Sequence, residues 1–169
     1  MAKNSNTTVS GIFRSRDDIS EIINSLEEKG ISEQDISILM SEETQKNQFG
    51  IDTDTKAPEG AVKGLTAGGL LGAVIGGLTL VGAVIIPGPG LVVAGPIIGI
   101  LAGMAAGGLA GTLVGALIGM GIPEYEAKFY EQSINERGNI LLVAHINKDL
   151  KPDVKKLFNQ YGAYHITSR

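Results

Sequence analysis

The sequence contains no cysteine and no tryptophan, and aromatic residues make up only 5% of it. Without cysteine the chain has no disulfide, no thiol nucleophile and no cysteine-ligated metal site, which fits a reducing compartment. The formal net charge of −4 comes from mixed acidic and basic residues without a basic run, so nucleic acid is not an expected partner. Charge itself is missing from one long stretch, because no charged residue lies between Gly64 and Pro123.

Glycine is concentrated in the same stretch. Of the 24 glycines, 19 lie between Gly60 and Gly121, so composition divides the chain into zones. We expect half of a small domain at 1–45, a polar linker at 46–59, a glycine-rich segment at 60–121 and the other half of the domain at 122–169.

The N-terminal zone predicts a strand, a helix and a second strand. Residues 8–14 alternate in polarity, and Ser15 is placed to cap a helix that Gly30 ends. A second alternating stretch follows at 36–40. The apolar side of the helix is expected at the spacing i, i+3, i+4, i+7, namely Ile19, Ile22, Ile23 and Leu26.

The C-terminal zone begins with a predicted helix from Pro123 to Arg137, which Gly138 ends. A continuous apolar run at 140–146 predicts a central buried strand, and residues 163–167 predict a last strand. The first helix is expected to bury Ile122, Tyr125, Phe129, Tyr130 and Ile134. A second helix, closed by Gly162, is expected to bury Val154, Leu157, Phe158 and Tyr161.

The two flanking zones are therefore approximate βαβ repeats, and neither half can bury its apolar face alone. The predicted fold class is α+β: a ferredoxin-like sandwich, a four-stranded antiparallel sheet with two helices on one face. Right-handed crossovers place the first and third strands at its centre. The glycine-rich segment interrupts this domain between its second and third strands.

Glycines recur at every fourth position in the central segment, in two series on either side of the predicted turn Pro87-Gly88-Pro89-Gly90. This spacing predicts a two-helix antiparallel glycine-zipper hairpin, because small residues let helix backbones approach closely in lipid. The packing positions are Gly64, Gly68, Gly72 and Gly76 in the first helix, and Gly99, Gly103, Gly107, Gly111 and Gly115 in the second.

Each half of the segment is long enough to cross a bilayer, which needs about 20 apolar residues. We therefore expect a membrane-associated homo-oligomer, in contact with lipid and with itself. Lys56, Lys63 and Lys128 flank the segment, so the α+β domain is expected on the cytoplasmic side of the inner membrane. Tyr125 and Tyr130 would then lie near the membrane interface. The alternatives are a soluble cytoplasmic oligomer with buried hairpins, which would serve as a scaffold or a ligand-sensing module, a pore, or a disordered glycine-rich segment.

No motif in the sequence predicts catalysis, and no cofactor or metal site is expected. His145 and His165 fall in different predicted strands, with the first strand between them, and no metal-binding spacing is present. Glu124, Glu126 and Glu131 are expected to offset the helix dipole rather than to act as acids or bases. Any small-molecule ligand is unknown.

The sequence resembles the bacterial general stress proteins, also described as heat-induced or low-temperature-induced. The matching features are Val9 to Phe13, the Gly-Ala-Val-Lys-Gly entry at 60–64, the glycine series, and the block from Gly121 to Tyr130 followed by Gly138. The resemblance implies a stress-linked, membrane-associated protein with no known catalytic residues. It implies no catalytic residue.

Overall fold

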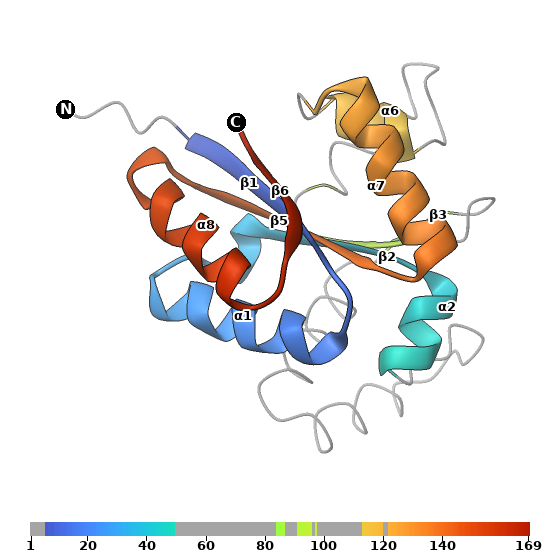
Figure 1. The fold of residues 1–169 in the computed structure, drawn as a ribbon, viewed down its shortest axis with the longest axis horizontal. Coiled ribbons are helices and arrows are strands. Elements are labelled where there is room, and N and C mark those ends of the chain that lie inside the picture. The colour runs from blue at the N-terminus through green and yellow to red at the C-terminus, as the bar shows by residue number, and fades with distance from the viewer. Residues whose placement is uncertain (1–5, 50–83, 87–90, 96, 98–112, 120–121) are drawn as a thin grey trace.

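Six strands form one antiparallel sheet in the computed structural model, in the order β3-β4-β2-β5-β1-β6 (Figure 1). The structure describes residues 6–49, 84–86, 91–95, 97, 113–119 and 122–169. The strands are β1 (Asn6–Phe13), β2 (Ile36–Ser41), β3 (Val84–Ile86), β4 (Leu91–Ala94), β5 (Ile140–Asn147) and β6 (Tyr164–Ser168). The helices are α1 (Arg16–Glu28), α2 (Glu42–Thr44), α6 (Leu113–Gly119), α7 (Glu124–Arg137) and α8 (Lys151–Gln160), with the short 3₁₀ helices η1 (Glu33–Asp35) and η3 (Lys148–Leu150) and the π-helix η2 (Gln45–Phe49).

The centre of the sheet follows the prediction. β1 and β5 pair along eight residues, from Asn6 opposite Asn147 to Phe13 opposite Ile140. β2 lies on the outer side of β5, and β6 lies on the outer side of β1. The fold class α+β is therefore confirmed, together with the central position of the first and third predicted strands.

Helix α1 forms for the local reasons seen in the sequence. Ser15 has extended backbone angles, and its hydroxyl accepts a hydrogen bond from the Asp18 amide at 3.2 Å, which satisfies one free amide of the first turn. Gly30 has a φ of 80° and ends the helix in the left-handed region. The predicted apolar side is fully buried: Ile19, Ile22, Ile23 and Leu26.

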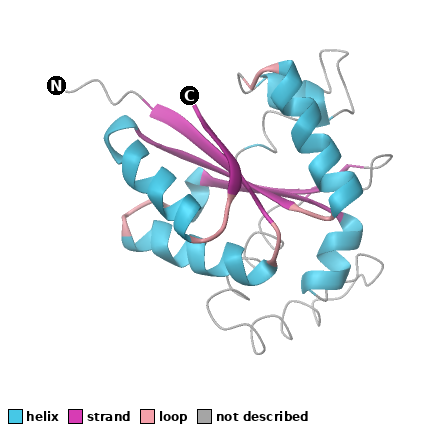
Figure 2. Cartoon of the chain, viewed as in Figure 1, coloured by secondary structure: helices cyan, strands magenta, loops and turns pink. Residues whose placement is uncertain are grey.

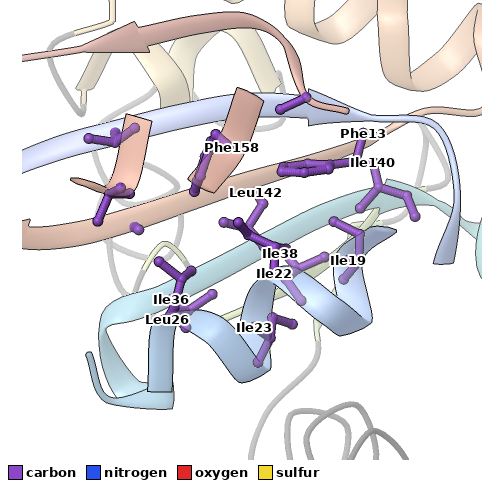
Figure 3. Close-up of a cluster of buried hydrophobic side chains, with 14 of the residues drawn as sticks. Phe13, Ile19, Ile22, Ile23, Leu26, Ile36, Ile38, Ile140, Leu142 and Phe158 are labelled. Atoms are coloured by element: carbon purple, nitrogen blue, oxygen red, sulfur yellow. The ribbon is translucent and has the colours of Figure 1, made fainter. Parts of the chain in front are cut away.

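The first core lies between the sheet and the pair of helices α1 and α8. Figure 3 shows the side chains of α1 pointing at those of β2 and β5, with Phe158 of α8 beside them. The rings of Phe13 and Phe158 meet edge to face, with centroids 5.4 Å apart. Val154 and Phe158 are fully buried as predicted, whereas Leu157 and Tyr161 are only partly buried.

A second core covers the opposite face of the sheet, which the prediction of helices on one face did not include. α6 and α7 lie there, across the sheet from α1 and α8, as Figure 2 also shows. The reason is visible in β5, where alternate residues face opposite cores and all are apolar up to Ala144. The residues of β5 facing α7 are Leu141 and Val143, and those facing α1 are Ile140, Leu142 and Ala144.

The sequence predicted helices on both sides of the turn 87–90, and this prediction is wrong for residues 84–86 and 91–94. These residues form β3 and β4, which pair with each other, and β4 continues the sheet beyond β2 from Ile38 opposite Ala94 to Ser41 opposite Leu91. The run of valine and isoleucine on both sides of the turn favours strands, because β-branched side chains suit a pleated surface. Pairing also satisfies the backbone groups of β2 that would otherwise lie at an edge.

The polar segment after β2 also differs in part from the prediction. Residues 42–49 are helical: Ser41 caps α2 by accepting from the Thr44 amide at 3.1 Å, and η2 continues to Phe49. Thr44 and Gln45 are buried. The rest of the predicted linker, 50–59, lies outside the described residues.

Gly95 ends β4 at a position where no side chain fits. Its φ is 93°, and a Cβ there would overlap the carbonyl oxygen of Ile36 and lie 2.8 Å from Cα of Ser37. The obstruction is backbone, which cannot rotate away as a side chain can. β4 can therefore approach the start of β2 only because residue 95 is glycine.

We expect Gly95→Ala to lower the free energy of unfolding by more than the roughly 1–2 kcal/mol that a left-handed conformation costs an L-residue. Gly30→Ala is the matched control, since Gly30 also has a positive φ but nothing lies within 4 Å of its added Cβ. Chemical denaturation of both variants separates the cost of the left-handed backbone conformation from the cost of the overlap between the added Cβ and the backbone of β2. Equal losses in the two variants would contradict the close approach of β4 and β2.

Candidate functional site

Most of the residues predicted to mediate assembly lie outside the described residues. This holds for the turn Pro87, Gly88, Pro89 and Gly90, and for Gly64, Gly68, Gly72, Gly76, Gly99, Gly103, Gly107 and Gly111. Gly115 is the exception, since it is a half-buried residue of α6. The structure therefore leaves the two glycine series as predictions and places only the end of the second one.

The end of that series packs on the domain itself. Leu113 and Leu117 of α6 are fully buried in the second core, against Ala127 and Tyr130 of α7. The turn between the two helices is closed by the Ile122 amide, which donates to the Leu117 carbonyl at 3.0 Å. Helix α6 is thus a structural part of the α+β domain.

A second attachment follows β4. Ile97 is fully buried in the same core, and its amide donates to the hydroxyl of Ser37 at 3.3 Å. Ser37 is itself fully buried in β2, where an unpartnered hydroxyl would be costly. The described parts of the segment 60–121 are therefore joined to the sheet by strand pairing, by this hydrogen bond and by apolar packing.

Three hydroxyl groups meet where α7 crosses β1 and β6. The Tyr130 hydroxyl lies 3.1 Å from Ser10 Oγ and 2.9 Å from Thr167 Oγ1, and the last two lie 2.7 Å apart. Tyr130 also donates to the His165 carbonyl at 3.5 Å. Tyr130 is fully buried, so these contacts satisfy a polar group inside an apolar core. We call Ser10, Tyr130 and Thr167 the hydroxyl cluster.

The electrostatics of the hydroxyl cluster favour a structural role. Burial raises the pKa of Tyr130, and this outweighs the opposing hydrogen bonds from Ser10 and Thr167. The tyrosine is therefore neutral at physiological pH. Among the described residues neither histidine ring hydrogen-bonds to Ser10, so the structure shows no base that would activate this hydroxyl.

The outer side of α7 carries an aromatic surface next to the hydroxyl cluster. The ring of His165 stacks on Phe129 with centroids 4.1 Å apart and meets the Tyr130 ring edge-on at 5.5 Å. His165 has a φ of 52° where the pairing of β6 with β1 is irregular, between Ser10 and Ile12. This β-bulge turns the exposed imidazole toward α7.

The predicted roles of the tyrosines need correction. Tyr130 is buried in the domain and does not face a membrane interface, whereas Tyr125 is 70% exposed and was wrongly placed on the buried side of α7. The helix instead buries Glu126, which is 8% exposed and accepts a hydrogen bond from the Tyr125 hydroxyl at 2.9 Å. That bond raises the pKa of Tyr125.

Glu124, the first of the predicted dipole-offsetting acids, is exposed and pairs with Lys128 at 2.6 Å. The hydrogen bond from Lys128 lowers the pKa of the Glu124 carboxyl. The pair joins residues i and i+4 at the start of α7, as expected for a surface helix.

His145 lies on β5, and β1 separates it from His165 on β6 as predicted. Its Nδ1 is 3.4 Å from Thr8 Oγ1, while its Nε2 is buried and has no hydrogen-bond partner among the described residues. Burial lowers the pKa of His145, against a smaller opposing effect of the Asp35 carboxylate. The folded protein therefore favours the neutral imidazole.

The described part of the chain contains no group of three or more histidine, aspartate and glutamate side chains arranged to hold a metal ion. No helix within it is both long and apolar enough to cross a bilayer.

The hydroxyl cluster was missed in the sequence. Its only local signal is Ser10, a polar residue in an otherwise apolar stretch that ends at Phe13. Its partners lie 120 and 157 residues away along the chain. Such a contact depends on where α7 crosses the sheet, which periodicity does not define.

We expect Tyr130→Phe to lower the free energy of unfolding by about 1 kcal/mol, the usual net value of a buried hydrogen bond. The loss stays small because Ser10 and Thr167 remain bonded to each other. Gln132→Ala on the exposed side of the same helix is the control and is expected to change stability little. A loss of the same size in both variants would argue against the hydroxyl cluster as the cause.

The low pKa of His145 predicts that acid weakens the fold. The unfolded chain binds a proton as the pH falls through about 6.5, while folded His145 still resists protonation, so stability declines there. Denaturation between pH 7.5 and 5.5 should show a smaller decline in His145→Gln. His165→Gln retains His145 and should decline like the parent; identical pH profiles for the parent and His145→Gln would refute this assignment.

Comparisons with family models, with curated proteins and with solved structures gave no match to this chain.

Proposed function

We propose that this chain is a non-enzymatic, stress-related protein that associates with the inner membrane and self-assembles through its segment 60–121. Its α+β domain would stay on the cytoplasmic side. The observation that carries the proposal is the absence of charge from Gly64 to Pro123 combined with glycine at every fourth position. A water-exposed segment of this composition would be unfavourable, so it needs lipid or protein around it.

The domain would be a ferredoxin-like sandwich extended by one ribbon. Strand order β2-β5-β1-β6, with α1 and α8 on one face, supports this assignment. Strands β3 and β4 would then be an addition to the edge of β2, and α6 and α7 an addition to the second face. In this view the domain serves as the anchor from which the glycine-rich residues act.

The segment 60–121 is attached to the domain through β3 and β4, which supports contacts made by the residues before β3 and by the residues after β4. Strand pairing holds residues 84–86 and 91–94 at the sheet, so two helices that meet at the turn 87–90 are not part of the proposal. The glycine series would instead pack against those of other copies, with lipid around them. In this arrangement the glycines would still serve helix packing, but between copies of the chain rather than within one hairpin.

A soluble homo-oligomer is the second candidate. The burial of Leu91, Val93, Leu113 and Leu117 in the domain's own core favours it, because these apolar residues of the segment already have protein partners. Such an oligomer would serve as a scaffold or as a ligand-sensing module. A pore is less favoured, because the charge-free stretch offers no ionisable group for an ion pathway.

Fractionation of expressing cells followed by carbonate washing distinguishes the candidates. We expect the protein to remain with the membrane pellet and to be released only by detergent. Light scattering of the detergent extract should then show an oligomer, and Gly107→Leu should reduce its size while the domain stays folded. A soluble large particle would favour the second candidate, and an oligomer unchanged by Gly107→Leu would remove the case for glycine packing.

A further inference from the structure

The chain is held at the domain at several points along and before the glycine-rich segment. Phe49 packs against the first core, with the Arg16 guanidinium over its ring at 5.6 Å. The chain is held again by β3 and β4 in the sheet, by Ile97, and by α6, which lies beside α7 in the second core (Figure 1). The intervals between these attachments are 50–83, 87–90 and 98–112.

These intervals are too short to cross a bilayer. A chain that leaves a charged domain and returns to it must cross an even number of times, and each crossing takes a helix of about 20 apolar residues. The interval 50–83 has 34 residues, of which only 64–83 are free of charge, and 98–112 has 15. Two crossings need about 40. The described fold and a membrane crossing between Phe49 and α6 therefore exclude each other.

The described parts of the segment have a composition that suits lipid. Residues 84–97 and 113–119 contain no charged, hydroxyl or amide side chain. β3 is the outermost strand on its side of the sheet, where strands that face water usually carry lysine or another charge. Ile118 on α6 is 43% exposed, although most large apolar side chains of the described residues are covered. These elements are therefore compatible with a bilayer as well as with the domain.

The contacts that hold these elements are of a kind that lipid can replace. Leu91, Val93, Leu113 and Leu117 are buried among apolar side chains, and a bilayer also keeps such side chains away from water. β4 is joined to β2 by backbone hydrogen bonds, and a helix in lipid satisfies the same groups internally. The two environments therefore compete for the same residues, and a bilayer can shift the balance by binding one state better.

The domain keeps a covered sheet without these elements. Strands β2, β5, β1 and β6 remain in order, with α1 and α8 on one face. On the other face α7 contacts β2 and β5 directly. It places Ala127, Tyr130 and Ile134 against the apolar side chains there. The loss of β3, β4 and α6 therefore exposes the edge of β2 and part of one face, and it leaves the rest of the domain in place.

We propose that this structure is the docked form of the chain, and that β3, β4 and α6 leave the sheet together when the segment embeds in a bilayer. Release rests on the proposed membrane association, and it is what that association requires of the domain. It frees the whole interval 50–121, whose charge-free part 64–121 has 58 residues. This exceeds the roughly 40 residues that two crossings need.

A disulfide between β2 and β4 tests the release. The chain has no cysteine, and Met40 lies opposite Val92 in an antiparallel ladder, where the Cα separation suits a disulfide. Full-length Met40→Cys with Val92→Cys is oxidised before vesicles of phosphatidylethanolamine and phosphatidylglycerol are added. We expect the oxidised form to embed about tenfold less than the reduced form, measured as protein that resists carbonate washing. Ile38→Cys with Ala94→Cys is a second lock in the same register.

Asn6→Cys with Asn147→Cys is the matched control. These exposed residues lie opposite each other on β1 and β5, which stay paired in both forms. The oxidised and reduced control should embed equally, so a loss confined to the β2–β4 locks identifies release as the blocked step. Oxidised locks that embed as well as their reduced forms would overturn the proposal.

Gly95→Ala shifts the balance in the opposite direction. In the docked form its Cβ would overlap the Ile36 carbonyl oxygen, whereas in a helix within lipid alanine is preferred to glycine. We expect the embedded fraction at limiting lipid to rise about threefold. Gly30→Ala strains the end of α1, outside the released elements, and should leave embedding unchanged. An equal rise in both variants would attribute embedding to a general loss of stability and would contradict release.

Hydrogen exchange distinguishes failure of release from failure of the proposed function. Vesicles should speed exchange of the β2 amides that bond to β4, while the amides shared by β1 and β5 stay protected. A parent protein that embeds with unchanged exchange in β2 would overturn release and leave membrane association standing. A parent protein that does not embed would contradict the proposed function, and with it the need for release.

Discussion

The described structure depends on a central strand that is apolar on both sides. From Ile140 to Ala144, β5 has no polar side chain, and alternate residues enter opposite cores. A strand of this kind requires cover on both faces, as in sheets that lie between helices. Helices α1 and α8 supply one cover, and α6 and α7 supply the other. The position of α6, the last described part of the glycine-rich segment, follows from this requirement.

The edge of β2 creates the second requirement. Without β4 its outer backbone groups would lie unpaired beside two apolar cores, a template for aggregation. The ribbon of β3 and β4 pairs with that edge, and its alternate residues enter both cores: Val92 the first, Leu91 and Val93 the second. Gly95 lets the chain leave this ribbon close to the backbone of β2. The insertion therefore completes the domain that it interrupts.

The sequence predicted those parts of the fold that depend on local periodicity and on caps. The α1 helix, its Ser15 cap, the Gly30, Gly138 and Gly162 ends and the run at 140–146 all appear in the structure. It failed where two local preferences compete, since Val84 to Ile86 lie in a glycine-rich context that favours helix packing in lipid and yet consist of strong strand formers. It also failed for the hydroxyl cluster, whose members come together from positions distant in sequence.

The attachment points limit how the glycine-rich residues can act. Strand β3 ends at Ile86 and β4 begins at Leu91, and both strands belong to the sheet, so each end of the segment 87–90 is held at the domain. Ile97 and Leu113 are buried in the same core, so both ends of the segment 98–112 are also held at the domain. Fifteen residues would span only about 22 Å even as a helix, which is less than a membrane core. Under the proposed function, and while these attachments hold, these residues would therefore contact a lipid surface or a neighbouring copy rather than cross a membrane completely, and the glycine spacing at 99–111 would serve close packing between copies.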